Sequence, residues 1–150
     1  KWGDIDFLLI DLPPGTGDIQ LSLCQNINLN GSIIVSTPQE VSLIDVRKAI
    51  NMFKKVNVPI LGLIQNMSFF EVNGEKNFIF GKDGVSKEAK TQNFELLGDI
   101  PIYPELSKAS DNGNPITDDL SKKVSKTYKI IMNNTLNSLK KLRIKNVKIL

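Results

Sequence analysis

Short apolar runs alternate with longer amphipathic segments along these 150 residues, and this alternation constrains the fold more than any other feature. Parallel strands buried on both faces read as continuous apolar runs, whereas covering helices carry an apolar stripe with helical spacing. The alternation therefore predicts βαβ units. The fold class is α/β, a mostly parallel sheet flanked by helices. Four strands are expected, at residues 5–10, 31–36, 59–65 and 95–100.

Helices are predicted between and after these strands. The expected spans are residues 18–27, 41–56, 83–92 and 103–110, followed by a long final helix that Thr117 can cap. In the first helix Asp18 is available as the N-cap, and Ile19, Leu23 and Ile27 share one face. In the second, four apolar side chains recur at helical spacing: Leu43, Val46, Ile50 and Phe53.

Residues 67–81 break the alternation. Segments 68–72 and 78–80 have strand-like composition and flank Asn73-Gly74. Asn-Gly is the strongest short signal for a tight hairpin turn, because both residues tolerate positive φ. We therefore expect a β-hairpin insertion near residues 68–81.

Composition excludes several classes of function. The formal net charge is +3, but residues 140–148 carry five cations, so the rest of the chain is slightly acidic and lacks a nucleic-acid-binding footprint. One cysteine, Cys24, and no histidine exclude an internal disulfide and any Ser-His-Asp or Cys-His site. The longest apolar stretch, 58–64, is too short to span a bilayer. We expect a cytoplasmic protein with no nucleic acid and no membrane as partner.

The segment from Asp11 to Asp18 follows the first predicted strand directly. A carboxylate that closes a buried apolar run suits a Walker-B role, in which Asp11 holds Mg²⁺, usually through water. Pro13 and Pro14 stiffen the exit from the strand, while Gly15 and Gly17 let the backbone approach a phosphate closely. The Gly15 amide could then bond a γ-phosphate and sense its loss.

The partner motif of such a site does not occur in these residues. A phosphate-cradling loop needs Gly-x-x-x-x-Gly-Lys-[Ser/Thr], and Gly81-Lys82 is followed by Asp83 without the preceding glycine. A triphosphate needs the amides and the lysine of that loop to offset its charge. We therefore expect residues 1–150 to be the C-terminal portion of one ATPase domain, inactive alone, with the phosphate loop upstream.

Further polar residues close the other predicted strands. The Asn66 carboxamide complements the N6/N7 edge of adenine, although an asparagine that only caps a turn is the commoner case. The 36–40 segment could line the same edge or simply begin a helix. Gly98-Asp99-Ile100-Pro101 ends the fourth strand, and the loop at Pro101 could pack against a base. In parallel sheets ligands bind at these carboxyl ends.

Taken together, these segments resemble the Mrp/ApbC family of iron–sulfur carrier ATPases, P-loop NTPases related to MinD. Order and spacing hold over about residues 5–116. The matching stretches are DLPPGTGD (11–18), STPQEV (36–41), DVRKAINMF (45–53), GLIQNMS (62–68), IFG (79–81), LGDIP (97–101) and SDNGNP (110–115).

The resemblance implies a homodimeric ATPase whose nucleotide state governs iron–sulfur cluster transfer to client proteins. ATP and Mg²⁺ are the implied cofactors. By position, Asp11 would be the Walker-B acid and metal ligand, and Gly15 the γ-phosphate sensor. Pro14 and Gly17 would complete that loop. Asn66 would read adenine, with Pro101 beside it.

One departure concerns the cluster. Many family members carry Cys-x-x-Cys between the Asn-Met-Ser segment and the Phe-Gly, where two subunits share a cluster, but residues 70–76 contain no cysteine. Since thiolates are the expected ligands, the usual cluster site is absent although the family assignment stands. Two other readings are a MinD/ParA-like positioning ATPase, favoured only by the basic tail, and a non-catalytic dimerisation or adaptor module.

Overall fold

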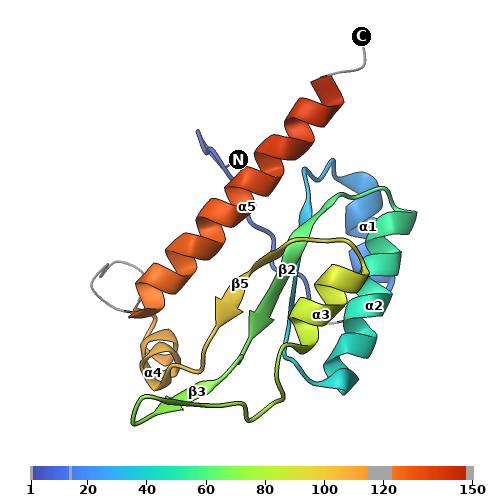
Figure 1. Cartoon of the computed structure of the whole chain (residues 1–150). Helices are drawn as coiled ribbons and strands as arrows, with labels where there is room; N and C mark the ends of the chain where they lie inside the picture. Colours follow the sequence, from blue (N-terminus) through green and yellow to red (C-terminus); the bar gives the residue numbers. More distant parts are fainter. Residues whose placement is uncertain (1, 14, 115–122, 148–150) are drawn as a thin grey trace.

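The computed structural model describes residues 2–13, 15–114 and 123–147 (Figure 1). Its centre is a three-stranded parallel sheet in the order β1-β2-β5. The strands are β1 (Ser32–Ser36), β2 (Ile60–Asn66) and β5 (Leu96–Ile100). The helices are α1 (Asp18–Asn26), α2 (Glu40–Lys55), α3 (Gly84–Thr91), α4 (Pro104–Asp111) and α5 (Lys123–Val147). The α/β class and the parallel sheet are confirmed.

The central strand β2 divides the core into two clusters. Successive side chains of a strand point to opposite faces, and Leu63 packs with α2 and α3 whereas Ile64 packs with α5. Figure 1 shows α5 crossing the sheet apart from the layer of α2 and α3. The four side chains predicted for the apolar face of α2 are all buried: Leu43, Val46, Ile50 and Phe53. Thr117, the expected cap of α5, lies outside the described residues.

The first predicted strand, at residues 5–10, is wrong for this structure. The segment is irregular, and its apolar side chains are exposed; Leu9 is 86% accessible. A strand buried on both faces needs a hydrogen-bonded neighbour and two covering layers. Among the described residues no ladder joins this segment to the sheet, so apolar composition alone does not form the strand.

The helix α1 is rotated relative to the prediction. Gln20 and Cys24 are buried, whereas Ile19 is 72% exposed and Ile27 also faces outward. The reason is local, because the Gln20 Nε2 atom donates a hydrogen bond to the Pro13 carbonyl at 2.9 Å and this draws a polar side chain inward. The N-cap position belongs to Gly17, and Asp18 is the first helical residue.

The hairpin consists of β3 (Phe70–Val72) and β4 (Glu75–Asn77), joined by the predicted turn. Asn73 and Gly74 have φ of 52° and 83°, which suits a two-residue turn between twisted strands. The second strand begins at Glu75, not at Phe78 as predicted, because so short a turn pairs Val72 with Glu75 at once. Phe78 instead packs its ring edge-on against Phe69.

Candidate functional site

The loop from Asp11 to Gly17 lies between the extended N-terminal segment and α1. Asp11 is exposed, and its carboxylate has no hydrogen-bond partner among the described residues. Gly15 has φ of 100°, a conformation that favours glycine, and Pro14 lies outside the described residues. The loop is anchored through the bond from Gln20 to Pro13. Sequence reasoning missed Gln20, because a glutamine in a helix gives no signal of burial.

The carboxyl ends of β2 and β5 place Asn66 and Pro101 close together. Asn66 pairs with Ile100 in the parallel register, and Pro101 follows directly. The Asn66 Oδ1 atom accepts a hydrogen bond from the Met67 amide at 3.0 Å. The Nδ2 group of Asn66 has no such bond to another described residue, so it can donate to a ligand.

The Asp11–Gly17 loop and the ends of β2 and β5 are not hydrogen-bonded to each other among the described residues. Sequence reasoning predicted both groups, and the parallel register places Asn66 beside Ile100, directly before Pro101.

A buried glutamine, Gln65, connects three elements at the same edge. Its Nε2 atom donates to Asp99 Oδ1 at 2.8 Å, and its Oε1 atom accepts from the Val85 amide at 3.1 Å. Burial raises the pKa of the Asp99 carboxyl, and the bond from Gln65 partly offsets that rise. Gln65 therefore links β2, β5 and the first turn of α3. Sequence reasoning named neither Gln65 nor this link.

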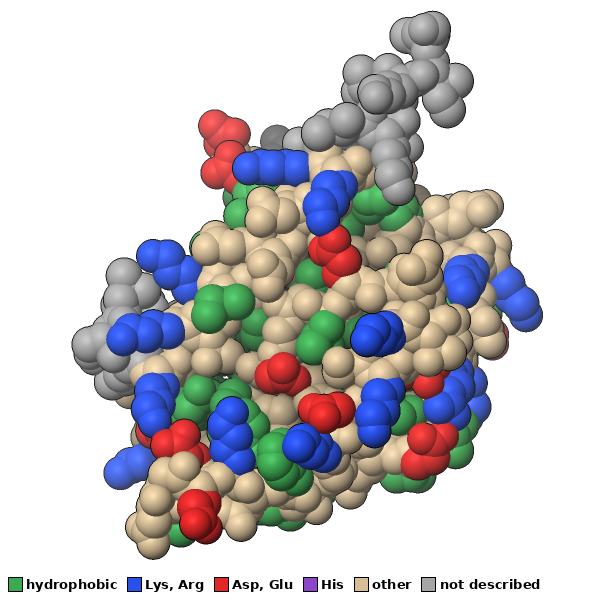
Figure 2. All heavy atoms as spheres, viewed as in Figure 1, with side chains coloured by type: hydrophobic (Ala, Val, Ile, Leu, Met, Phe, Trp, Pro, Cys, Tyr) green, Lys and Arg blue, Asp and Glu red, His purple; other side chains and the backbone are tan. Residues whose placement is uncertain are grey.

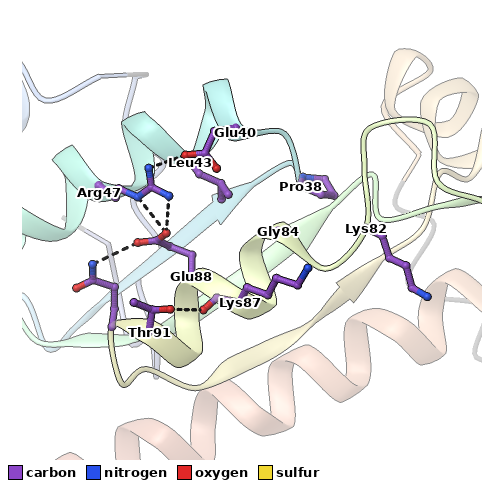
Figure 3. Close-up of a pocket in the computed structure, with 10 residues that line it drawn as sticks. Pro38, Glu40, Leu43, Arg47, Lys82, Gly84, Lys87, Glu88 and Thr91 are labelled. Atoms are coloured by element: carbon purple, nitrogen blue, oxygen red, sulfur yellow. Dashed lines mark hydrogen bonds and ion pairs between the residues drawn. The ribbon is translucent and has the colours of Figure 1, made fainter.

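A groove of about 510 Å³ lies between α2 and α3, away from the predicted site residues. Figure 3 shows Arg47 extending from α2 between Glu40 and Glu88. The guanidinium donates to Glu88 Oε2 through two nitrogens, at 3.0 and 2.8 Å. Glu88 is 7% exposed, and the bond from Arg47 lowers the pKa of its carboxyl. A buried carboxylate needs such a partner, so this cluster stabilises the contact between the two helices.

The Glu88 pair predicts a pH-dependent loss of stability. We expect Glu88→Gln to lower the free energy of unfolding at pH 7 by about 1–2 kcal/mol, because the charge-assisted hydrogen bonds from Arg47 are weakened. Since the folded pKa is depressed, the stabilisation exists above the unfolded pKa and disappears as pH falls through the folded pKa. The difference between variant and wild type, measured by urea unfolding, should therefore shrink as pH falls below about 4.

Glu40→Gln is the matched control, because Glu40 also pairs with Arg47 but its side chain is 70% exposed. Its effect should stay within about 0.5 kcal/mol. Equal losses for both variants, or a Glu88→Gln effect that does not change with pH, would contradict this assignment.

The described residues offer no ligand set for a metal cluster. No group of three or more His, Cys, Asp or Glu side chains lies together in them. Cys24 is 6% exposed, and burial raises the pKa of its thiol. Since reactive thiols are accessible and have lowered pKa values, Cys24 is a core residue. On the face shown in Figure 2, basic and acidic side chains are interspersed. No described helix combines the length and apolarity needed to cross a bilayer.

Comparison with known proteins decides the family. Residues 1–136 match the ParA-type family model described as NUBPL iron-transfer P-loop NTPase. The chain belongs to this family. The resemblance to Mrp carriers predicted from the motifs is thereby confirmed.

Individual relatives agree with the family. The iron-sulfur cluster carrier protein of Aquifex aeolicus is 51% identical over 118 residues, which cover 77% of this chain and 32% of that protein. The iron-sulfur cluster transfer protein NUBPL of Mus musculus is 51% identical over 77% of this chain and 37% of that protein. An Arabidopsis thaliana iron-sulfur protein required for NADH dehydrogenase, mitochondrial, is 46% identical over 95% of this chain and 46% of its own length. The chain therefore spans less than half of each of these family members.

Solved structures confirm the fold of the family. A nucleotide-binding protein from Archaeoglobus fulgidus in complex with ADP aligns with a TM-score of 0.67 and 45% identity, over 75% of this chain and 47% of that one. The cell division ATPase MinD of Pyrococcus furiosus aligns with a TM-score of 0.53 at 20% identity, over 75% of this chain and 43% of that one. The second likeness concerns the fold alone.

Proposed function

We propose that these 150 residues are the C-terminal portion of one ATPase domain of an iron–sulfur cluster carrier. In this proposal a phosphate loop lies upstream, and the longer chain that contains it is called the full-length protein below. The observation that carries the proposal is the Asp11–Gly17 loop, which has a free carboxylate and a positive-φ glycine at the start of α1, in a P-loop NTPase family member. Support also comes from the ADP complex of the Archaeoglobus fulgidus relative.

Each residue of the Asp11–Gly17 loop would have its own role in binding the phosphates. Asp11 would hold Mg²⁺, because an exposed, unpaired carboxylate suits a hydrated hard cation. The metal would offset charge that develops on the transferred phosphoryl group. The Gly15 amide would bond the γ-phosphate, with Pro14 and Gly17 fixing the path of the loop. The N-terminus of α1 favours an anion beside it.

At the other end, Asn66 would recognise the adenine base and Pro101 would pack against it. We expect Asn66→Ala in the full-length protein to weaken ATP binding about tenfold, because one polar contact to the base is lost. GTP binding should change little, so the preference for ATP over GTP should fall. Isothermal titration with both nucleotides measures this. An unchanged ATP-to-GTP ratio would show that Asn66 does not read the base.

The iron–sulfur cluster would be the cargo of the protein. Residues 70–76 would not ligate it, because they contain no cysteine. Four thiolates usually hold a cluster, and two copies of the chain would bring only two buried Cys24 side chains. We therefore place the ligands elsewhere in the full-length protein. A homodimer, client proteins and a cytoplasmic location complete the proposal; some relatives are named mitochondrial or chloroplastic. Iron and sulfide analysis after anaerobic reconstitution tests cluster carriage, and no stoichiometric cluster would remove it.

A further inference from the structure

The hairpin insertion, residues 67–83, lies between the end of β2 and the start of α3. Its two strands have three residues each, and most of its side chains are exposed. A two-stranded hairpin of this size is not stable alone in water. Its position must therefore be set by contacts with the rest of the chain, which include an ion pair between Lys123 of α5 and Glu71 at 3.0 Å and backbone bonds at its base.

Backbone bonds join the first leg of the insertion to the loop at Pro101. The Ser68 amide donates to the Ile100 carbonyl at 3.0 Å, and the Ile102 amide donates to the Phe69 carbonyl at 2.8 Å. These two bonds flank Pro101. The insertion and the proposed adenine-binding edge consequently share one hydrogen-bonded framework.

Gln65 joins the other end of the insertion to β5. It bonds Val85, which lies just beyond the insertion, and Asp99, which lies two residues before Pro101. Its side chain is 3% exposed, and a buried amide is costly unless both of its ends are bonded. Only a side chain that donates at one end and accepts at the other satisfies both partners, because Val85 offers an N–H and Asp99 a carboxylate.

A second feature marks the same base. The Ser68 hydroxyl is buried, with the residue 2% exposed, and makes no hydrogen bond among the described residues. Such an unpaired group is destabilising, and another arrangement of the hairpin base could satisfy it. The hydroxyl therefore adds nothing to the stability of the hairpin base.

We propose that Gln65 is a positioning residue that ties the hairpin insertion to the adenine-binding edge, so that nucleotide occupancy is relayed to the hairpin. This relay rests on the proposed function, whereas the tie itself does not. A nucleotide bound between Asn66 and Pro101 would restrain the ends of β2 and β5. Gln65 and residues 68–69 are hydrogen-bonded to these strand ends, so the restraint would extend to the hairpin.

Hydrogen exchange of the 150-residue chain at pH 7 tests the tie. Gln65→Leu removes both bonds, and Gln65→Glu sets a second carboxylate against Asp99. We expect amides in residues 68–83 to exchange about tenfold faster in both variants. In Gln65→Glu/Asp99→Asn the donor and acceptor are exchanged, and exchange should return close to wild type. The buried amides of α2 should not change.

Two results would overturn the tie. One is a Gln65→Glu hairpin that exchanges like wild type. The other is equal acceleration in α2 and the hairpin without rescue by the double variant, which would mean that Gln65 only fills the core.

Hydrogen exchange of the full-length protein, measured with and without saturating ADP, tests the relay. In wild type, ADP should slow exchange in residues 68–83, and in Gln65→Leu the bound nucleotide should leave hairpin exchange unchanged. A Gln65→Leu hairpin that responds to ADP as wild type does would overturn the relay. If ADP does not bind wild type at all, the proposed function fails and the relay with it, while the variant series on the 150-residue chain still decides the tie.

Discussion

Replacing Asp11 by asparagine is expected to lower magnesium-dependent ATP hydrolysis by the full-length protein about 100-fold or more. The proposed Mg²⁺ contributes several kcal/mol of transition-state stabilisation, and each 1.36 kcal/mol is a factor of ten in rate. Asparagine keeps the size of the side chain but removes the charge that holds the cation. The variant should therefore still fold and still bind ADP without magnesium.

Asp6→Asn is the matched control for Asp11. Asp6 lies on the same exposed segment, five residues earlier, and no role is assigned to it. Its turnover, followed by phosphate release across a magnesium titration, should match that of wild type. Asp11→Asn with undiminished turnover would show that the metal lies elsewhere. ATP binding without turnover in wild type would instead favour an adaptor.

Gly84→Ala is expected to destabilise the chain by about 3 kcal/mol, because the added methyl group has no room. A Cβ atom at Gly84 would lie 2.0 Å from the Pro38 carbonyl oxygen and 2.8 Å from its carbonyl carbon. Both atoms belong to the backbone, so the clash is relieved only if the start of α3 moves away from the loop before α2. That movement would also disturb the Val85 bond to Gln65.

Ser86→Ala, two residues further along α3, is the control for Gly84. Alanine is a better helix former than serine, and its effect should stay within about 0.5 kcal/mol. Urea unfolding followed by circular dichroism compares the two variants with wild type. A Gly84→Ala variant as stable as wild type would contradict this expectation, because it would mean that the loop at Pro38 moves away from the added methyl group at little cost in free energy.

The parts of the fold that depend on local pattern were predictable. The stripe from Leu43 to Phe53 fixes the buried face of α2, and Asn73-Gly74 fixes the hairpin turn. The segment 5–10 was misjudged, since an apolar run forms a strand only where a neighbour and covering layers exist. The composition of a segment shows that it is apolar. It does not show whether a neighbouring strand and covering helices are present.

The polar contacts around the candidate site were not predictable. The partners Gln65 and Asp99 are 34 residues apart, and Arg47 and Glu88 are 41 apart. Neither pair has a local signature, because the parallel register and the packing of α3 on α2 bring the side chains together. The residues proposed to contact nucleotide could be nominated from the sequence, because Asn66 and Pro101 follow predicted strands and Asp11–Gly17 is a Pro/Gly-rich segment.

A crystal structure of the full-length protein with Mg²⁺ and a non-hydrolysable ATP analogue would show whether residues 11–17, Asn66 and Pro101 form one nucleotide site. We expect the metal held by Asp11, the γ-phosphate at the Gly15 amide, and adenine between Asn66 and Pro101. A nucleotide bound elsewhere, with Asp11 and Asn66 both in solvent, would contradict this prediction.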